Sequence, residues 1–251
     1  MCSNRLQLYT AKTEIIWFTT GPRQNRLPTS AVRVGTDHVY PSKSVRDLGI
    51  YLDADVSMST HVSRTVSRCF GALRQLRTVR RSVPTDTFRS LVVSLVLARL
   101  DYGNATLAGL PAYQVRRLQS VMNAGARLIF GSAKTEHVTP LLRQLHWLKA
   151  GERINFKVAT LAFQCLHGTA PGYLSAELHR VADMPARSHL RSASTMQLNV
   201  PRMRLRTVGD RAFPVASAKI WNSLPAHVTT ATSTRSFRKR LKTHFFTLCF
   251  P

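Results

Sequence analysis

The spacing of apolar residues changes at Ser59, and this change limits what the chain can fold into. Before it, Glu14–Phe18 and Val45–Leu52 are short mixed segments typical of strands, and the two halves of 32–40 predict a hairpin around Gly35. After it, apolar residues recur about every 3.6 positions, as in amphipathic helices. The sequence therefore predicts a mainly α fold that begins with a small mixed α/β region at residues 1–58.

Proline and glycine punctuate the helical part, because proline suits a first helical turn and glycine a helix end. The expected helices begin at Ser59, after Pro84, at Pro111 (ending at Gly131), at Pro140 (to Leu148), near Ile154 (ending at Gly168) and at Ser233 (to Phe246). The run 88–97 is apolar nearly all round, which predicts a central helix. Residues 183–210 are rich in Arg and Ser with little periodicity, which predicts a linker or an arm ordered on binding. Three parts are expected: 1–58, a helical body at 59–180, and the arm with a basic last helix at 181–251.

The charge balance points to a polyanionic partner. Lys and Arg total 36 against 12 Asp and Glu, a net charge of +24, and 28 of the cations are Arg. The guanidinium group matches phosphate oxygens bidentately, and each neutralised phosphate releases counterions. Residues 1–60 carry a net charge of only +2, whereas 61–150 and 151–251 carry +11 each. A nucleic-acid surface is therefore expected in the last four-fifths of the chain.

Basic residues cluster at the end of the first long helix, in the alternating segment 201–206 and on the last helix. The residues predicted to contact nucleic acid are Arg64, Arg68, Arg74, Arg77, Arg80, Arg81, Arg116, Arg117, Arg202, Arg204, Arg206, Arg238 and Arg240. A solvated charged face is the simpler interpretation of any one cluster, but three clusters with few acids favour phosphate contact. The last helix also fits a membrane surface or a partner groove.

Four dispersed cysteines form no CxxC pair, which disfavours a zinc ribbon or disulfide scaffold and suits a reducing, intracellular location, nuclear or cytoplasmic. The first residues lack the apolar core of a secretion signal. The most apolar run, 91–100, is about half of what a membrane span needs and contains Arg99. We expect no transmembrane segment.

Candidate catalytic groups are few. Asp53 and Asp55 could hold a Mg²⁺ ion on one face of a strand, but their place before a helix favours capping or a turn. His137, His146, Cys165 and His167 lack the spacing of a zinc site, so packing or surface roles are favoured. No G-x-S-x-G elbow and no phosphate-binding loop with a Gly-Lys-Ser/Thr end is present. A complete catalytic centre and a metal site are therefore not expected.

Several short stretches resemble the reverse transcriptases of non-LTR (LINE-type) retrotransposons. Residues 3–8 with Lys12-Thr13-Glu14 are similar to the segment that follows the catalytic aspartates, and 44–53 to the downstream "LG" block. The remainder is similar to the C-terminal extension of jockey and CR1-like elements, through 99–104, 145–148, 165–168 and 221–225. The resemblance covers essentially the whole chain, and the order of the motifs carries it.

The resemblance implies a palm-like remnant at 1–58 and a thumb-like helical body after it. Lys12 would take a general-acid or orienting role; the alternative is that it is an ordinary solvent-facing lysine. Leu48 and Gly49 would form a turn near the primer grip. The family's Tyr-x-Asp-Asp motif is absent, so the carboxylates that hold its Mg²⁺ ions are missing.

We therefore expect a truncated reverse transcriptase-like protein that binds RNA or an RNA/DNA duplex, has no polymerase activity alone and holds no cofactor by itself. The oligomeric state is open. Alternatives are a cationic helical protein that binds acidic partners or anionic membranes, a metal enzyme using Asp53 and Asp55, or an unselected relic with an aggregation-prone strip at 88–100.

Overall fold

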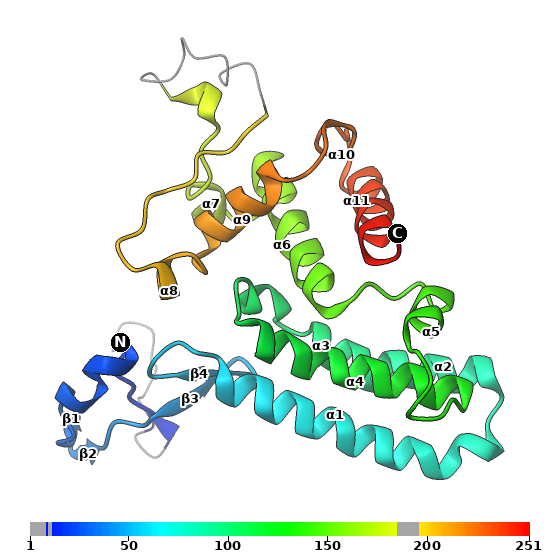
Figure 1. The fold of residues 1–251 in the computed structure, drawn as a ribbon. Coiled ribbons are helices and arrows are strands. Elements are labelled where there is room, and N and C mark those ends of the chain that lie inside the picture. Colours follow the sequence, from blue (N-terminus) through cyan, green and yellow to red (C-terminus); the bar gives the residue numbers. More distant parts are fainter. Residues whose placement is uncertain (1–8, 10–11, 185–195) are drawn as a thin grey trace. The chain divides into compact units, whose positions relative to one another are not determined.

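The computed structural model describes residue 9, residues 12–184 and residues 196–251, and it is mainly helical (Figure 1). The α-helices are α1 Ser59–Val79, α2 Thr85–Val92, α3 Ala98–Asp101, α4 Ala112–Phe130, α5 Thr139–Gln144, α6 Ala150–Leu166, α7 Gly172–Ser175, α8 Arg206–Gly209, α9 Phe213–Asn222, α10 Ala226–Thr229 and α11 Thr234–Cys249. Short 3₁₀ turns are η3 Gly21–Arg26, η4 Arg80–Ser82, η6 Asn104–Leu107 and η7 Val181–Asp183, and η5 Val93–Leu97 is a π-helix. The expected mainly α fold is confirmed.

The chain divides into two compact units, Met1–Arg64 and Thr65–Pro251. The first holds two separate two-stranded antiparallel sheets, β1 Val32–Val34 with β2 Asp37–Val39, and β3 Ser44–Asp47 with β4 Ile50–Asp53. The second holds all helices after α1, including those of 181–251: both α9 and α11 pack against α6. The predicted separation of 181–251 from the helical body therefore has no counterpart in the contacts.

The N-terminal strands differ in part from the prediction. The hairpin at 32–40 is confirmed, with a two-residue turn at Gly35 and Thr36. Residues 45–52 were expected as one strand but form a second hairpin, because Leu48 (φ 44°) and Gly49 (φ 87°) both have the positive φ of a two-residue type I′ turn. The strand expected at 14–18 is wrong: only Ile15 makes an isolated bridge, to Pro41.

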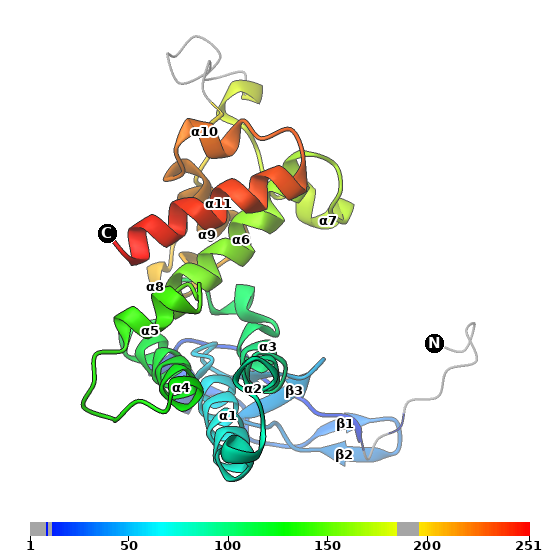
Figure 2. The ribbon, with the colours of Figure 1, turned by 90° about the vertical axis from the view of Figure 1, so that its right-hand side faces the viewer.

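In the second unit, the part of α1 from Thr65 onward lies beside α2 and α4, seen nearly end-on in Figure 2. Gly125 of α4 lets these helices approach, because a Cβ placed there would lie 3.3 Å from Val92 Cγ1 and 3.8 Å from Leu73 Cδ2. Gly131 ends α4 with φ 68°, as the sequence predicted. The predicted apolar helix at 88–97 is not buried all round, since Val93 and Leu95 are each 40% exposed.

A second helical layer of α6, α9 and α11 is held by aromatic side chains, one from each helix. Phe163, Trp221 and Phe237 are each at most 1% exposed, with ring centroids 4.4 Å apart for Phe163–Phe237 and 5.8 Å for Trp221–Phe237. The expected arm is partly folded here: Trp221 donates a hydrogen bond to the carbonyl of Met196, and Leu198 is buried. Residues 185–195 of that arm lie outside the described chain.

Candidate nucleic-acid interface

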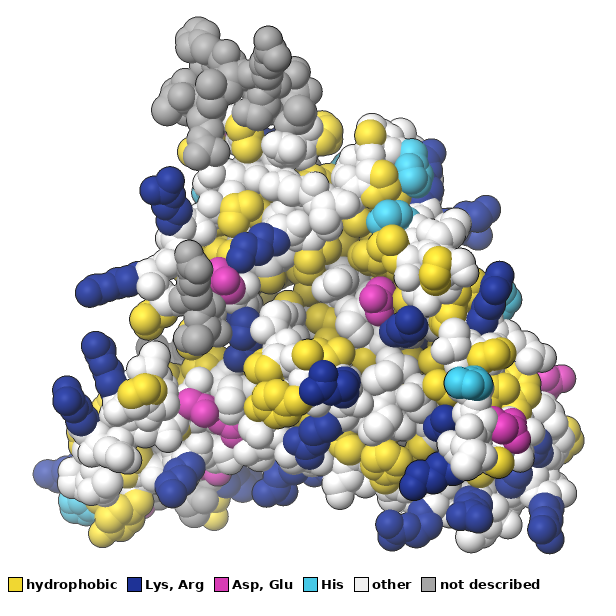
Figure 3. Space-filling view, viewed as in Figure 1, with side chains coloured by type: hydrophobic (Ala, Val, Ile, Leu, Met, Phe, Trp, Pro, Cys, Tyr) yellow, Lys and Arg dark blue, Asp and Glu magenta, His cyan; other side chains and the backbone are white. Residues whose placement is uncertain are grey.

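A groove of about 970 Å³ lies where α1 and α4 end, within the second unit. Its cations are Arg74, Arg77, Arg80, Arg81, Arg127 and Lys134. None of the described residues that line it is acidic. Figure 3 shows Lys and Arg side chains gathered at the lower right, over the region where α1 and α4 end in Figure 1. The groove is therefore a concentrated positive site formed by two elements about 50 residues apart in sequence.

The helical period explains why the arginines of α1 share this groove. Leu73 and Leu76 point into the core, at 5% and 6% exposure. Arg74 and Arg77 are three residues apart and therefore lie on the same side of the helix, and Arg81 follows in η4. All three are exposed, and none of their side chains forms a hydrogen bond or an ion pair with another described residue. Their guanidinium groups are therefore available to an anion.

Helix ends offer a competing explanation for a basic cluster, because a helix C-terminus attracts cations. Each C-terminus carries about half a negative charge, so the ends of α1 and α4 together account for about one cation. The groove holds six. The helix ends therefore account for only about one of the six cations.

Arg80 is the member that the fold uses. Its Nε and Nη2 donate to the carbonyls of Leu128 and Ile129 at 3.3 and 2.9 Å, and Nη2 also donates to Thr85. Its guanidinium carbon lies 5.0 Å from the ring centroid of Phe88, which is fully buried. Arg80 thus ties the end of α1 to the end of α4. Arg80 therefore has a structural role in addition to its predicted contact with nucleic acid.

The Arg80→Ala variant is expected to lower the free energy of unfolding by about 2 kcal/mol, since it leaves two helix-end carbonyls unpaired and removes a cation–π contact. The Arg81→Ala variant removes the neighbouring exposed charge, and we expect a change within about 0.5 kcal/mol. Urea unfolding followed by circular dichroism measures both. Equal losses for the two variants would contradict the structural role of Arg80.

Arg127 and Lys134 complete the groove and were missed by the sequence-based site. Nη2 of Arg127 donates to the carbonyl of Glu136 at 3.0 Å, and Glu136 Oε1 accepts the amide of Ala133 at 3.0 Å. These bonds hold the loop after Gly131, which places Lys134 at the groove. The available signal was the position of Arg127 four residues before a helix-ending glycine.

The other predicted contacts lie outside this groove. Arg64 belongs to the first unit, where its guanidinium carbon lies 4.8 Å from the ring centroid of Tyr51. Arg68 is exposed on α1, Arg116 and Arg117 lie on the first half of α4, and Arg202 and Arg204 are exposed before α8. Arg206 begins α8, which ends the alternating extended pattern, and its side chain lies outside the described structure.

On α11, Arg238 and Arg240 are both exposed, and Arg240 donates to the carbonyl of His227 at 2.7 Å. The apolar side of this helix, Phe237 and Leu241, is fully buried. The sequence also allowed the last helix to bind in a groove of a partner protein. In the structure, the helix packs against α6 of the same chain instead. That apolar side is not available to a bilayer.

Lys12 is exposed in the first unit, with Nζ 5.4 Å from the ring centroid of Tyr9. Residues 3–8 of the family-like segment lie outside the described residues. Asp53 caps the start of α1, where its Oδ2 accepts the amide of Thr60 at 3.0 Å, and Asp55 forms a turn before the helix, where its Oδ1 accepts the amide of Ser57 at 2.9 Å. The capping or turn interpretation of this pair is therefore confirmed, with a cap at Asp53 and a turn at Asp55.

The histidine–cysteine cluster is not assembled. His167 stacks on Phe163 with ring centroids 3.8 Å apart, whereas His146 lies 5.4 Å from Phe246. Among the residues that the structure describes, no group of three or more His, Cys, Asp or Glu side chains is placed to hold a metal ion. The packing interpretation of these residues holds for His167.

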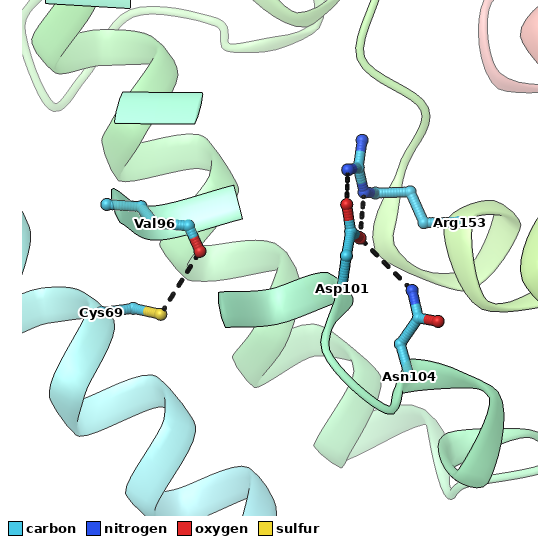
Figure 4. Close-up of polar contacts among 5 residues, drawn as sticks. All are labelled: Cys69, Val96, Asp101, Asn104 and Arg153. Atoms are coloured by element: carbon cyan, nitrogen blue, oxygen red, sulfur yellow. Dashed lines mark hydrogen bonds and ion pairs between the residues drawn. The ribbon is translucent and has the colours of Figure 1, made fainter. Parts of the chain in front are cut away.

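Cys69 is fully buried beside η5, where its thiol lies 3.7 Å from the carbonyl of Val96 (Figure 4). Burial raises the pKa of this thiol from 9.0 to about 11, partly offset by the charge of Arg99. Burial also raises the pKa of Cys165 and Cys249. These three buried thiols therefore ionise less readily than a free thiol.

Iodoacetamide at about pH 9, where a free thiol is half ionised, is expected to leave Cys69 unmodified in the folded chain and to alkylate it in urea. Because the folded pKa lies above 9.0, we also expect the free energy of unfolding to fall as the pH rises from 9.0 towards about 11. Mass spectrometry of the Cys69 peptide measures the first effect. Equal alkylation with and without urea would contradict the burial.

No protein family, characterised protein or solved structure matches this chain. No helix within the described residues is long and apolar enough to cross a membrane.

Proposed function

We propose that this chain binds the phosphate backbone of RNA or of an RNA/DNA duplex in the groove at the ends of α1 and α4. The observation that carries the proposal is that Arg74, Arg77 and Arg81 are exposed in one groove and have no side-chain partner among the described residues. The described residues that line this groove include no acid. Binding to a phosphate backbone requires positively charged side chains that are long enough to contact the phosphates. It does not require an element that reads the bases. Arg80 holds the two walls together, so the groove needs little reorganisation when an anion enters.

The motif resemblance supports the wider proposal that this is the nucleic-acid-holding C-terminal region of a reverse transcriptase-like retroelement protein. In this proposal the chain holds a template or duplex and does not copy it, because it lacks the Tyr-x-Asp-Asp carboxylates. The burial of the apolar side of α11 favours nucleic acid over an anionic membrane as the polyanion.

Fluorescence anisotropy of a labelled RNA/DNA duplex, titrated with the chain between roughly 0.05 and 0.2 M salt, tests the proposal. If Arg74, Arg77, Arg81, Arg127 and Lys134 each meet one phosphate, log K should fall against log salt with a slope of roughly −4 to −5. Binding that is undetectable at the lowest salt, or that does not depend on salt, would refute it.

Two further polyanions separate this function from a general cationic one. Polyglutamate of matched charge and vesicles with anionic lipid serve as competitors for the labelled duplex. We expect both to compete weakly, because neither presents phosphates at the spacing of a nucleic-acid backbone. Competition by polyglutamate equal to that of unlabelled duplex would instead favour an acidic protein partner.

A further inference from the structure

A second groove of about 680 Å³ lies in the same unit, between α2, η5, the start of α6 and α11. Its size falls within the range of small-molecule sites. Apolar residues, among them Val93, Leu97 and Phe156, line part of it. Charged side chains from α2, α3, α6 and α11 line much of the rest. The groove therefore combines an apolar surface with positive charge.

The charges of this groove are mostly uncompensated. Asp101, its acidic residue, forms a two-bond ion pair with Arg153 and also accepts from Asn104, as Figure 4 shows. The other cations are Arg89, Lys157, Arg238 and Lys242, which form no ion pair with another described residue. All four are exposed. Arg89 also donates Nη2 to the carbonyl of Leu145 at 3.3 Å. The groove thus offers Lys157, Arg238 and Lys242 to an anionic ligand, while its one carboxylate is already paired with Arg153.

Two features of the groove are typical of a ligand-binding site: an aromatic ring beside a planar cation, and a π-helix in the wall. Phe156 is half-buried, and the guanidinium carbon of Arg238 lies 5.9 Å from its ring centroid, so an aromatic ring and a planar cation stand together. The wall is interrupted by η5, where the amide of Ala98 donates to the carbonyl of Val93 five residues earlier. Such π-bulges frequently occur at functional sites.

We propose that this second groove binds a nucleoside phosphate. The phosphate would lie against Arg238 and Lys242, which are one helical turn apart on α11, with Lys157 of α6 opposite. The base would lie on Phe156 and the apolar residues beside it. The proposal does not rest on duplex binding by the first groove, since the two sets of lining residues share no member.

Isothermal titration of the full chain with AMP tests the proposal. We expect saturable binding, and at least about tenfold weaker binding by the Arg238→Glu/Lys242→Glu variant, because two charge-assisted contacts become repulsive. The matched control is Arg235→Glu/Lys239→Glu, an exposed pair on the same helix that does not line the groove. The control should bind AMP within about twofold of the parent chain, as surface charges without contact have small effects.

Further ligands separate the sources of the phosphate. Adenosine and inorganic phosphate should each bind at least about tenfold more weakly than AMP if base and phosphate both contribute, and vesicles with anionic lipid headgroups should not displace AMP. Phe156→Leu should reduce the preference for AMP over inorganic phosphate. No saturable AMP binding, equal weakening in the control, equal binding of inorganic phosphate, or displacement by vesicles would each overturn the proposal.

The two proposed binding activities can be tested independently of each other. The Arg238→Glu/Lys242→Glu variant should keep the salt slope of duplex binding, whereas a variant of the α1 arginines should lose duplex binding and keep AMP binding. Loss of both activities in either variant would show one continuous polyanion surface and would overturn a separate nucleotide site.

Discussion

Duplex binding should weaken by about 100-fold or more at 0.1 M salt when Arg74, Arg77 and Arg81 are all replaced by glutamate. Each guanidinium group that meets a phosphate is worth at least about 1 kcal/mol, and a carboxylate in its place repels the backbone. The slope of log K against log salt should also become less steep by roughly 3, since three phosphate contacts are lost. Fluorescence anisotropy over a salt series measures both quantities.

The matched control for this variant changes the net charge by the same amount elsewhere. Arg23 and Arg26 in η3 and Arg235 in α11 are exposed and lie outside the groove. Their joint replacement by glutamate should leave most of the affinity and nearly the full salt slope. If the control loses as much affinity as the groove variant, binding follows net charge and the groove is not the site.

The Trp221→Ala variant should lower the free energy of unfolding by about 3–5 kcal/mol, the range for removing a buried aromatic side chain. Trp221 is 1% exposed, stacks on Phe237 and donates Nε1 to the carbonyl of Met196 at 2.8 Å. The loss is a large share of the stability of an ordinary domain. Urea unfolding followed by circular dichroism measures it.

Two controls identify the cause. Trp221→Phe keeps an aromatic ring but leaves the Met196 carbonyl without its donor, and we expect it to cost about 1–2 kcal/mol. Trp17→Ala removes a tryptophan that is 39% exposed in the first unit and should have a much smaller effect. A loss of under about 1 kcal/mol for Trp221→Ala would contradict its place at the centre of the α6–α9–α11 core.

The helix ends could be predicted from the sequence, because they are set by single residues at or next to the end of a helix. Gly131 after an amphipathic segment marked the end of α4, and Ser233 marked the start of α11, where its side chain accepts the amide of Ser236. The hairpin at 44–53 was missed by periodicity because its turn begins with leucine. A leucine rarely adopts positive φ, so nothing in the alternation separated turn from strand.

The site was predicted only in outline, because charge along the sequence does not show what each cation meets. Arg80 and Arg81 are equivalent in the sequence, yet Arg80 reaches carbonyls 48 and 49 residues away and Arg81 reaches none among the described residues. Arg127 and Lys134 join the groove only through the packing of α4 beside α1. Partners this far apart are set by tertiary structure, which one sequence does not reveal.

The packing of α11 on α6 has a consequence for synthesis on the ribosome. Phe163 is made long before Phe237, and no earlier helix supplies the ring that stacks on it at 4.4 Å. The part of the α6 surface that α11 covers therefore emerges from the exit tunnel uncovered and stays so until residues up to Cys249 have followed. During that interval the nascent second unit exposes an aromatic surface to chaperones and to neighbouring nascent chains.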